Sequence, residues 1–124
     1  MIMDKIIRIL ILEDCIADAD MMEFELQEAE IPFISKRVIT EENYLQALQE
    51  FSPDLILSDY DLPQYNGSLA LAEAKARCSD TPFILVTGAT NEDLANEIIT
   101  KGAYDFVQKG QLHKLAPAIR KVFA

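Results

Sequence analysis

The stretch DLILSDYDLPQYNG, residues Asp54–Gly67, carries the pattern that decides the fold. Its first five residues, Asp54–Ser58, form a largely apolar run that is typical of a strand buried on both faces of a sheet. Asp59 follows directly, and Pro63 and Gly67 then mark a loop. The stretch therefore predicts a buried strand whose carboxyl end presents an acidic side chain.

Short apolar runs and helical patterns alternate on both sides of this stretch. The other predicted strands are Ile6–Leu12, Phe33–Val38, Phe83–Thr87 and Tyr104–Gln108. The predicted helices are residues 18–30, a helix capped by Thr40 and ended by Pro53, one through Leu69 and Ala76, one capped by Asn91 and ended before Gly102, and one over Leu112–Val122. Five βα units without a repeat or linker predict an α/β fold in a single domain, residues 1–124. We expect a doubly wound, five-stranded parallel sheet of order 2-1-3-4-5, the flavodoxin-like (βα)5 three-layer sandwich.

The composition limits the range of functions. The chain has 124 residues, with 11 Lys and Arg against 21 Asp and Glu, which gives a net charge of −10. Such an acidic surface repels polyanions, so we expect no direct nucleic-acid binding. Cys15 and Cys78 belong to no metal-binding motif and are interpreted as packing residues in a reducing compartment. The N-terminus has no signal-peptide pattern, and Ile6–Leu12 is too short to span a bilayer, so we expect a cytoplasmic protein with no membrane segment.

Polar side chains stand where the predicted strands end. Glu13 and Asp14 follow the first strand, Asp59 the third and Lys109 the fifth, while Thr87 ends the fourth. In open α/β sheets, ligands bind beyond the carboxyl ends of the strands. We therefore expect these five residues to converge on one cleft.

The chemistry of this set points to phosphoryl transfer. Clustered carboxylates repel one another unless a cation lies among them, and oxygen ligands in an open site favour Mg²⁺. A carboxylate can act as the nucleophile that accepts a phosphoryl group. Lys109 would offset the charge of that group, and the Thr87 hydroxyl would donate a hydrogen bond to it.

Four segments resemble the receiver domains of two-component response regulators. They are ILILED at Ile9–Asp14, DLILSDYDLPQYNG at Asp54–Gly67, ILVTGA at Ile84–Ala89 and DFVQKG at Asp105–Gly110. The resemblance covers nearly the whole chain, with the segments in the family's order and spacing. It implies that Asp59 is the phosphoacceptor and that Mg²⁺ is held by Glu13, Asp14, Asp59 and the main-chain carbonyl of Asp61.

The same resemblance implies how the domain would work. Thr87 and Lys109 would bind the phosphoryl group, and Phe106 would be the aromatic residue that turns inward when the switch operates. A histidine kinase or phosphotransfer protein would supply the phosphoryl group, and the fourth helix, fifth strand and fifth helix would change in response. The domain would be a switch that assists its own phosphorylation and dephosphorylation, not an enzyme of metabolism. A fused or separate output module and a phosphorylation-dependent homodimer are left open.

The sequence departs from the family pattern at a few positions. Members usually have proline after the lysine, where this chain has Gly110. Asp61 adds a further acidic side chain near the phosphoacceptor, and Ala89 leaves access to the site open.

Two other classes of function compete with this interpretation. Asp59-Tyr60-Asp61 is similar to the DxD motif of Mg²⁺-dependent phosphatases with an aspartate nucleophile, although Pro63 stands where that motif has Thr or Val. The second alternative is a receiver-like interaction module that never takes phosphate.

Overall fold

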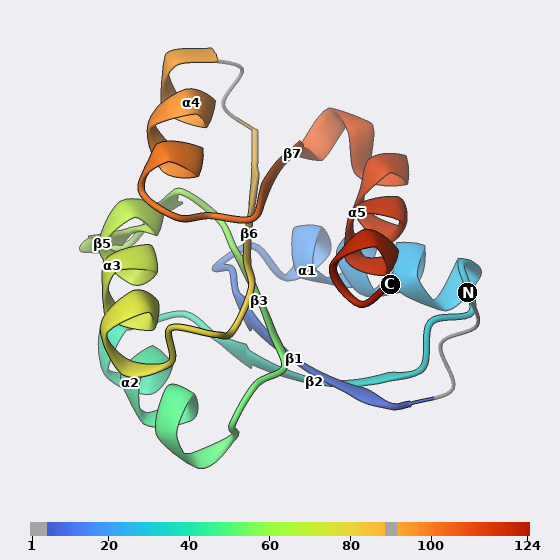
Figure 1. Cartoon of the computed structure of the whole chain (residues 1–124), viewed down its shortest axis with the longest axis horizontal. Helices are drawn as coiled ribbons and strands as arrows, with labels where there is room; N and C mark the ends of the chain where they lie inside the picture. The colour runs from blue at the N-terminus through green and yellow to red at the C-terminus, as the bar shows by residue number, and fades with distance from the viewer. Residues whose placement is uncertain (1–4, 89–91) are drawn as a thin grey trace.

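Helices and strands alternate along the chain in the computed structural model, which describes residues 5–88 and 92–124 (Figure 1). The strands are β1 (Ile7–Leu12), β2 (Phe33–Val38), β3 (Leu55–Ser58), β4 (Asp61–Leu62), β5 (Tyr65–Asn66), β6 (Phe83–Thr87) and β7 (Asp105–Gln108). The helices are α1 (Ile16–Glu28), α2 (Glu41–Glu50), α3 (Gly67–Arg77), α4 (Glu92–Thr100), the 3₁₀ helix η1 (Lys109–Lys114) and α5 (Leu115–Val122).

The five longer strands form one parallel sheet of order β2-β1-β3-β6-β7. Counting only these strands, this is the predicted order 2-1-3-4-5, which the structure confirms. The bounds of β2 and β6 agree with the prediction, and β1, β3 and β7 each begin one residue later than expected. The short strands β4 and β5 form a separate antiparallel hairpin in the region predicted as a loop.

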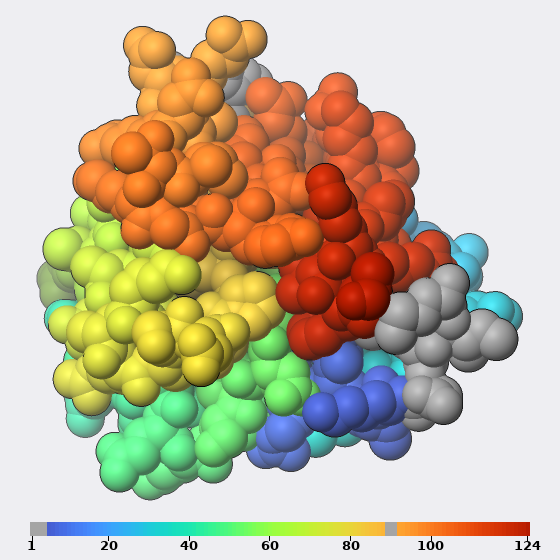
Figure 2. Space-filling model, viewed as in Figure 1, coloured from blue at the N-terminus to red at the C-terminus, as the bar shows by residue number. Residues whose placement is uncertain are grey.

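The sheet is covered on both faces, as a three-layer sandwich requires. Alternate residues of β1 enter opposite cores: Ile9 and Ile11 pack toward α1 and α5, and Leu10 and Leu12 pack toward α2 and α3. This explains why β1 is apolar apart from Arg8 near its start. In the space-filling view, α3 and α4 lie next to each other on the left, and α5 lies on the right of the same face (Figure 2).

The ends of several helices follow the signals in the sequence. The Thr40 side chain accepts a hydrogen bond from the Asn43 backbone N–H at 3.1 Å and so caps α2. Gly102 ends the α4 segment with φ 115°, a conformation that favours glycine. The predicted cap Asn91 lies outside the described residues. The last helical segment begins as the 3₁₀ helix, and the α-helix proper starts at Leu115.

The cysteine interpretation needs one correction. Cys78 is partly buried against the core, but Cys15 is exposed, because it precedes α1 on the loop that leaves β1. Both thiols are free. Within residues 5–88 and 92–124, the helices are too short or too polar to cross a membrane.

Candidate functional site

Three carboxylates meet where β1 and β3 end. One oxygen each from Glu13, Asp14 and Asp59 lies within 4.8 Å of the others. The backbone sets this arrangement: the Asp59 N–H donates to the Leu12 carbonyl at 2.9 Å, which extends the β1–β3 pairing by one residue. Glu13 is 3 % exposed and Asp59 is 7 % exposed, whereas Asp14 faces solvent. The structure thus brings together the acidic residues predicted from the strand ends.

Lys109, the first residue after β7, is the cation of this site. Its Nζ lies 2.7 Å from Glu13 Oε1 and 3.1 Å from Asp59 Oδ2. It also donates a hydrogen bond of 2.7 Å to Oδ2 of Asp18, in the first turn of α1. The sequence predicted the first two neighbours and missed Asp18.

Burial and charge shift the pKa values of these groups. Burial raises the pKa of Glu13 to about 7, against the opposing effects of Lys109 and the Cys15 backbone N–H. Burial alone would lower the pKa of Lys109, but its hydrogen bonds to the surrounding carboxylates outweigh that effect and raise it. The hydrogen bond from Lys109 lowers the pKa of Asp18. One cation among several acids leaves an excess of negative charge.

The other predicted site residues lie around this centre. Thr87 is the last residue of β6, is 2 % exposed, and pairs in register with Gln108, the residue before Lys109. Phe106 in β7 is partly buried and packs against the core on the α2, α3 and α4 side. Asp61 is exposed, and Ala89 lies outside the described residues.

The loop that follows Asp59 is held by close backbone contacts. The Tyr60 N–H donates to Asp59 Oδ1 at 2.7 Å, and the Gly67 N–H donates to the Tyr60 carbonyl at 2.7 Å. A Cβ at Gly67 would lie 2.9 Å from the Asp59 carbonyl oxygen and 2.7 Å from Leu85 Cδ1. Glycine is therefore required here because α3 begins directly against the backbone of the acidic residue.

The acidic cluster fits a hard divalent cation. All its donors are carboxylate oxygens, the ligands that Mg²⁺ and Ca²⁺ prefer. Oε1 of Glu13 is buried, and among the described residues it has the ion pair with Lys109 but no aligned hydrogen-bond donor. It therefore keeps lone pairs for a cation, while the exposed Asp14 leaves one side of the cluster open to water. Magnesium would polarise phosphate oxygens at this position.

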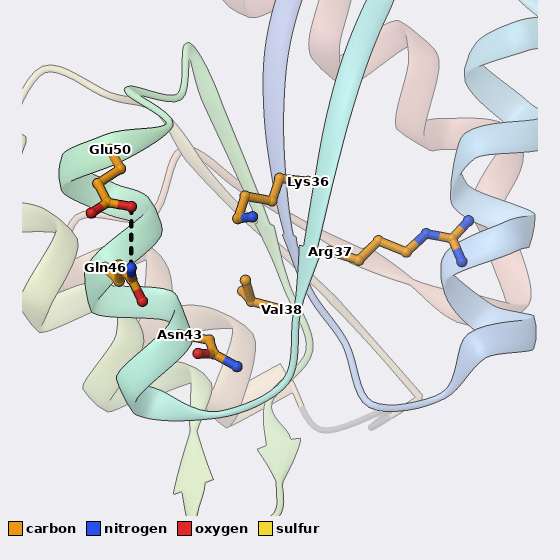
Figure 3. A pocket seen from close by; sticks show the side chains of 6 residues that line it. All are labelled: Lys36, Arg37, Val38, Asn43, Gln46 and Glu50. Atoms are coloured by element: carbon orange, nitrogen blue, oxygen red, sulfur yellow. Dashed lines mark hydrogen bonds between the residues drawn. The ribbon is translucent and has the colours of Figure 1, made fainter.

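A hollow of about 230 Å³ lies between β2 and α2, away from the acidic cluster (Figure 3). Lys36 points toward it, and Gln46 donates to Glu50 across one side at 3.1 Å. Arg37 points the other way, toward α1. The hollow lacks the carboxylate triad and Lys109, so the strand ends form the better candidate site.

This chain belongs to the response regulator receiver domain family, whose family model matches residues 9–120. The chemotaxis protein CheY of Bacillus subtilis is 29% identical over 118 residues, which are 92% of this chain and 95% of that protein. The regulatory protein AtoC of Escherichia coli is 34% identical over 65 residues, which are 52% of this chain. That match covers only 14% of AtoC, so the chain spans a small part of this relative's length.

Solved structures share the fold. The receiver domain of DrrB, activated by BeF3, superposes with a TM-score of 0.83 at 21% identity, covering 96% of this chain and 98% of that one. A CheY-like receiver domain protein from Methanospirillum hungatei superposes with a TM-score of 0.78 at 23% identity, covering 94% and 93%. The chain is thus a two-component receiver domain with the flavodoxin-like fold.

Proposed function

We propose that this receiver domain accepts a phosphoryl group on Asp59 and uses Mg²⁺ to do so. The observation that carries the proposal is the convergence of the Glu13, Asp14 and Asp59 carboxylates within 4.8 Å beside the single ammonium of Lys109. The family membership supports it, because receiver domains typically bind Mg²⁺ and serve as phosphoacceptors.

Each residue has a defined part in the reaction. A carboxylate oxygen of Asp59 attacks phosphorus as the bond between phosphorus and the donor histidine nitrogen breaks, and an acyl phosphate forms on Asp59. Glu13, Asp14, Asp59 and the Asp61 carbonyl would hold the metal, which would polarise the phosphoryl oxygens. Lys109 and Thr87 stabilise the phosphoryl oxygens with a positive charge and a hydroxyl donor.

The phosphorylated domain then acts as a switch. Thr87 and Phe106 lie on the adjacent strands β6 and β7. The helix between these strands, α4, packs on the same side of the sheet as Phe106. Movement of Thr87 toward the phosphoryl group would favour an inward position of Phe106 and shift the α4–β7–α5 surface. The donor is a histidine kinase or phosphotransfer protein in the cytoplasm, and the output is a fused or separate module.

The test is phosphorylation by a small phosphodonor, followed by intact mass measurement. We expect the mass of one phosphoryl group to be added to the wild type with Mg²⁺, little with EDTA, and none to Asp59→Asn. Label that persists in Asp59→Asn would contradict the assignment of the acceptor. A wild type that takes no label would favour the interaction module, and steady hydrolysis of a phosphomonoester would favour the phosphatase.

A further inference from the structure

Asp18 contacts the candidate site without belonging to its acidic cluster. It lies in the first turn of α1, four residues after Asp14, and its side chain is 39 % exposed at the rim. Its Oδ2 accepts a hydrogen bond of 2.7 Å from Lys109, 91 residues away in sequence. The contact is shorter than the 3.1 Å separation between Lys109 and the phosphoacceptor Asp59.

The ammonium of Lys109 is surrounded by carboxylates, with hydrogen bonds to Asp18 and Asp59 and an ion pair with Glu13. An ammonium group has three N–H bonds, and Lys109 has three carboxylates around it, Glu13, Asp18 and Asp59. An incoming phosphoryl group would therefore compete with these carboxylates for the ammonium of Lys109. The strength of the carboxylate contact that Lys109 gives up decides how easily the lysine reaches the phosphoryl group.

Asp18 is the carboxylate around Lys109 for which a bound metal would not compete. Glu13 and Asp59 belong to the cluster that fits a cation, so a bound divalent ion would compete with Lys109 for their oxygens. Asp18 lies outside that cluster, and the lysine contact remains its neutralising partner. With a metal bound, Asp18 would be the carboxylate that still holds the ammonium toward α1.

We propose that Asp18 is a positioning residue that restrains Lys109 and thereby lowers the affinity of the site for a phosphoryl group. This inference rests on the proposed function of Asp59. Among residues 5–88 and 92–124, the hydrogen bond to Lys109 is the contact that links Asp18 to the site, so we expect Asp18 to act through the lysine. Its removal should free one ammonium donor for the phosphoryl oxygens.

The experiment measures the affinity of the Mg²⁺-bound protein for beryllofluoride, a phosphoryl mimic, by ¹⁹F NMR. Asp18→Asn keeps the side-chain shape and removes the charge, and we expect it to tighten binding by about fivefold, the effect of one partly exposed ion pair. Asp18→Glu restores the carboxylate and should return the affinity toward that of the wild type. Asp20→Asn is the matched control, because it removes a carboxylate from the same helix that pairs with Arg37 instead.

Two further readouts separate restraint of the lysine from a general charge effect. In a Lys109→Gln background, Asp18→Asn should no longer change the affinity. The ammonium signal of Lys109 in ¹⁵N-resolved NMR should show faster proton exchange in Asp18→Asn and remain unchanged in Asp20→Asn. Unchanged or weaker beryllofluoride binding by Asp18→Asn, or an equal gain without Lys109, would overturn the inference. If the wild type binds no beryllofluoride with Mg²⁺, the proposed function itself fails.

Discussion

Two cations in this protein are paired with carboxylates of helix α1, and they differ in their surroundings. Arg37 in β2 lies 2.7 Å from Asp20 and 2.9 Å from Glu23, and all three side chains reach solvent. Lys109 lies among Glu13, Asp18 and Asp59, of which Glu13 is fully buried. Figure 3 shows Arg37 extended toward α1.

The difference lies in the charge balance and the burial. The Arg37 group sets two carboxylates against one guanidinium, and Ser35 donates a further hydrogen bond of 3.0 Å to Glu23. Water can screen the remaining negative charge, because these side chains are exposed. At the strand ends, a buried excess of negative charge surrounds one ammonium, and burial makes this costly. The comparison teaches that the surface group connects α1 to β2, whereas the buried group has an excess of negative charge that a divalent cation would offset.

The largest contrast should appear in the binding of Mg²⁺. Asp14→Asn removes one carboxylate from the cluster, and we expect the affinity for Mg²⁺ to fall by about tenfold to a thousandfold, depending on local screening. Asp20→Asn removes the same charge from the Arg37 group and should leave the affinity nearly unchanged. Isothermal titration calorimetry measures both, and equal losses would mean that only the net charge matters.

The close packing of Gly67 against the backbone of Asp59 can be tested by a separate substitution. Gly67→Ala should lower the free energy of unfolding by about 1–3 kcal/mol, because the new Cβ forces the Asp59 carbonyl or Leu85 to move. Gly110→Ala is the matched control, since a Cβ there has open space around it. Urea unfolding compares the two variants, and equal stability would contradict the close packing at Gly67.

The burial of Glu13 also predicts a pH dependence of stability. The folded protein holds the Glu13 proton up to about pH 7, against an ordinary pKa of 4.5, because the side chain is buried. The resulting stabilisation is complete below pH 4.5 and is lost as the pH rises through 7, with a size on the order of 2 kcal/mol. Urea unfolding of the metal-free protein at pH 5 and pH 8 should show this loss. Glu13→Gln should reduce this loss of stability. An equally steep loss in that variant would show that the pH dependence comes from another group.

The smallest effect should come from the surface group. Arg37→Ala should cost about 1 kcal/mol or less of stability, and the loss should shrink further in high salt because the pairs are exposed. Thermal unfolding at low and high salt measures it. A large loss of stability that does not depend on salt would show that the Arg37 group resembles the buried Lys109 group more than its exposure indicates.

The sequence predicts the sheet and the position of the acidic cluster well, for a physical reason. A strand buried on both faces is mostly apolar, so the apolar runs of β1, β3 and β6 can be recognised without any knowledge of their neighbours. The topology then brings the residues after these strands to one edge. Glu13, Asp59 and Lys109 could therefore be placed together before the structure was known.

The features that the sequence did not predict depend on contacts between segments that are distant along the chain. Asp18 resembles any acid in the first turn of a helix, and only the packing of α1 beside η1 gives it Lys109 as a partner. Gly67 is an expected loop residue, but its closeness to the Asp59 carbonyl depends on where α3 begins. The β4–β5 hairpin consists of two-residue strands, too short for a periodic pattern.

The most direct test of the central claim is a crystal structure of this chain with Mg²⁺ and beryllofluoride. We expect Mg²⁺ on the carboxylates of Glu13, Asp14 and Asp59 and on the Asp61 carbonyl, with beryllium bound to an Asp59 oxygen and Thr87 and Lys109 turned toward the fluorides. Density for both ions away from Asp59, with Lys109 still paired to a bare Asp59 carboxylate, would contradict the account.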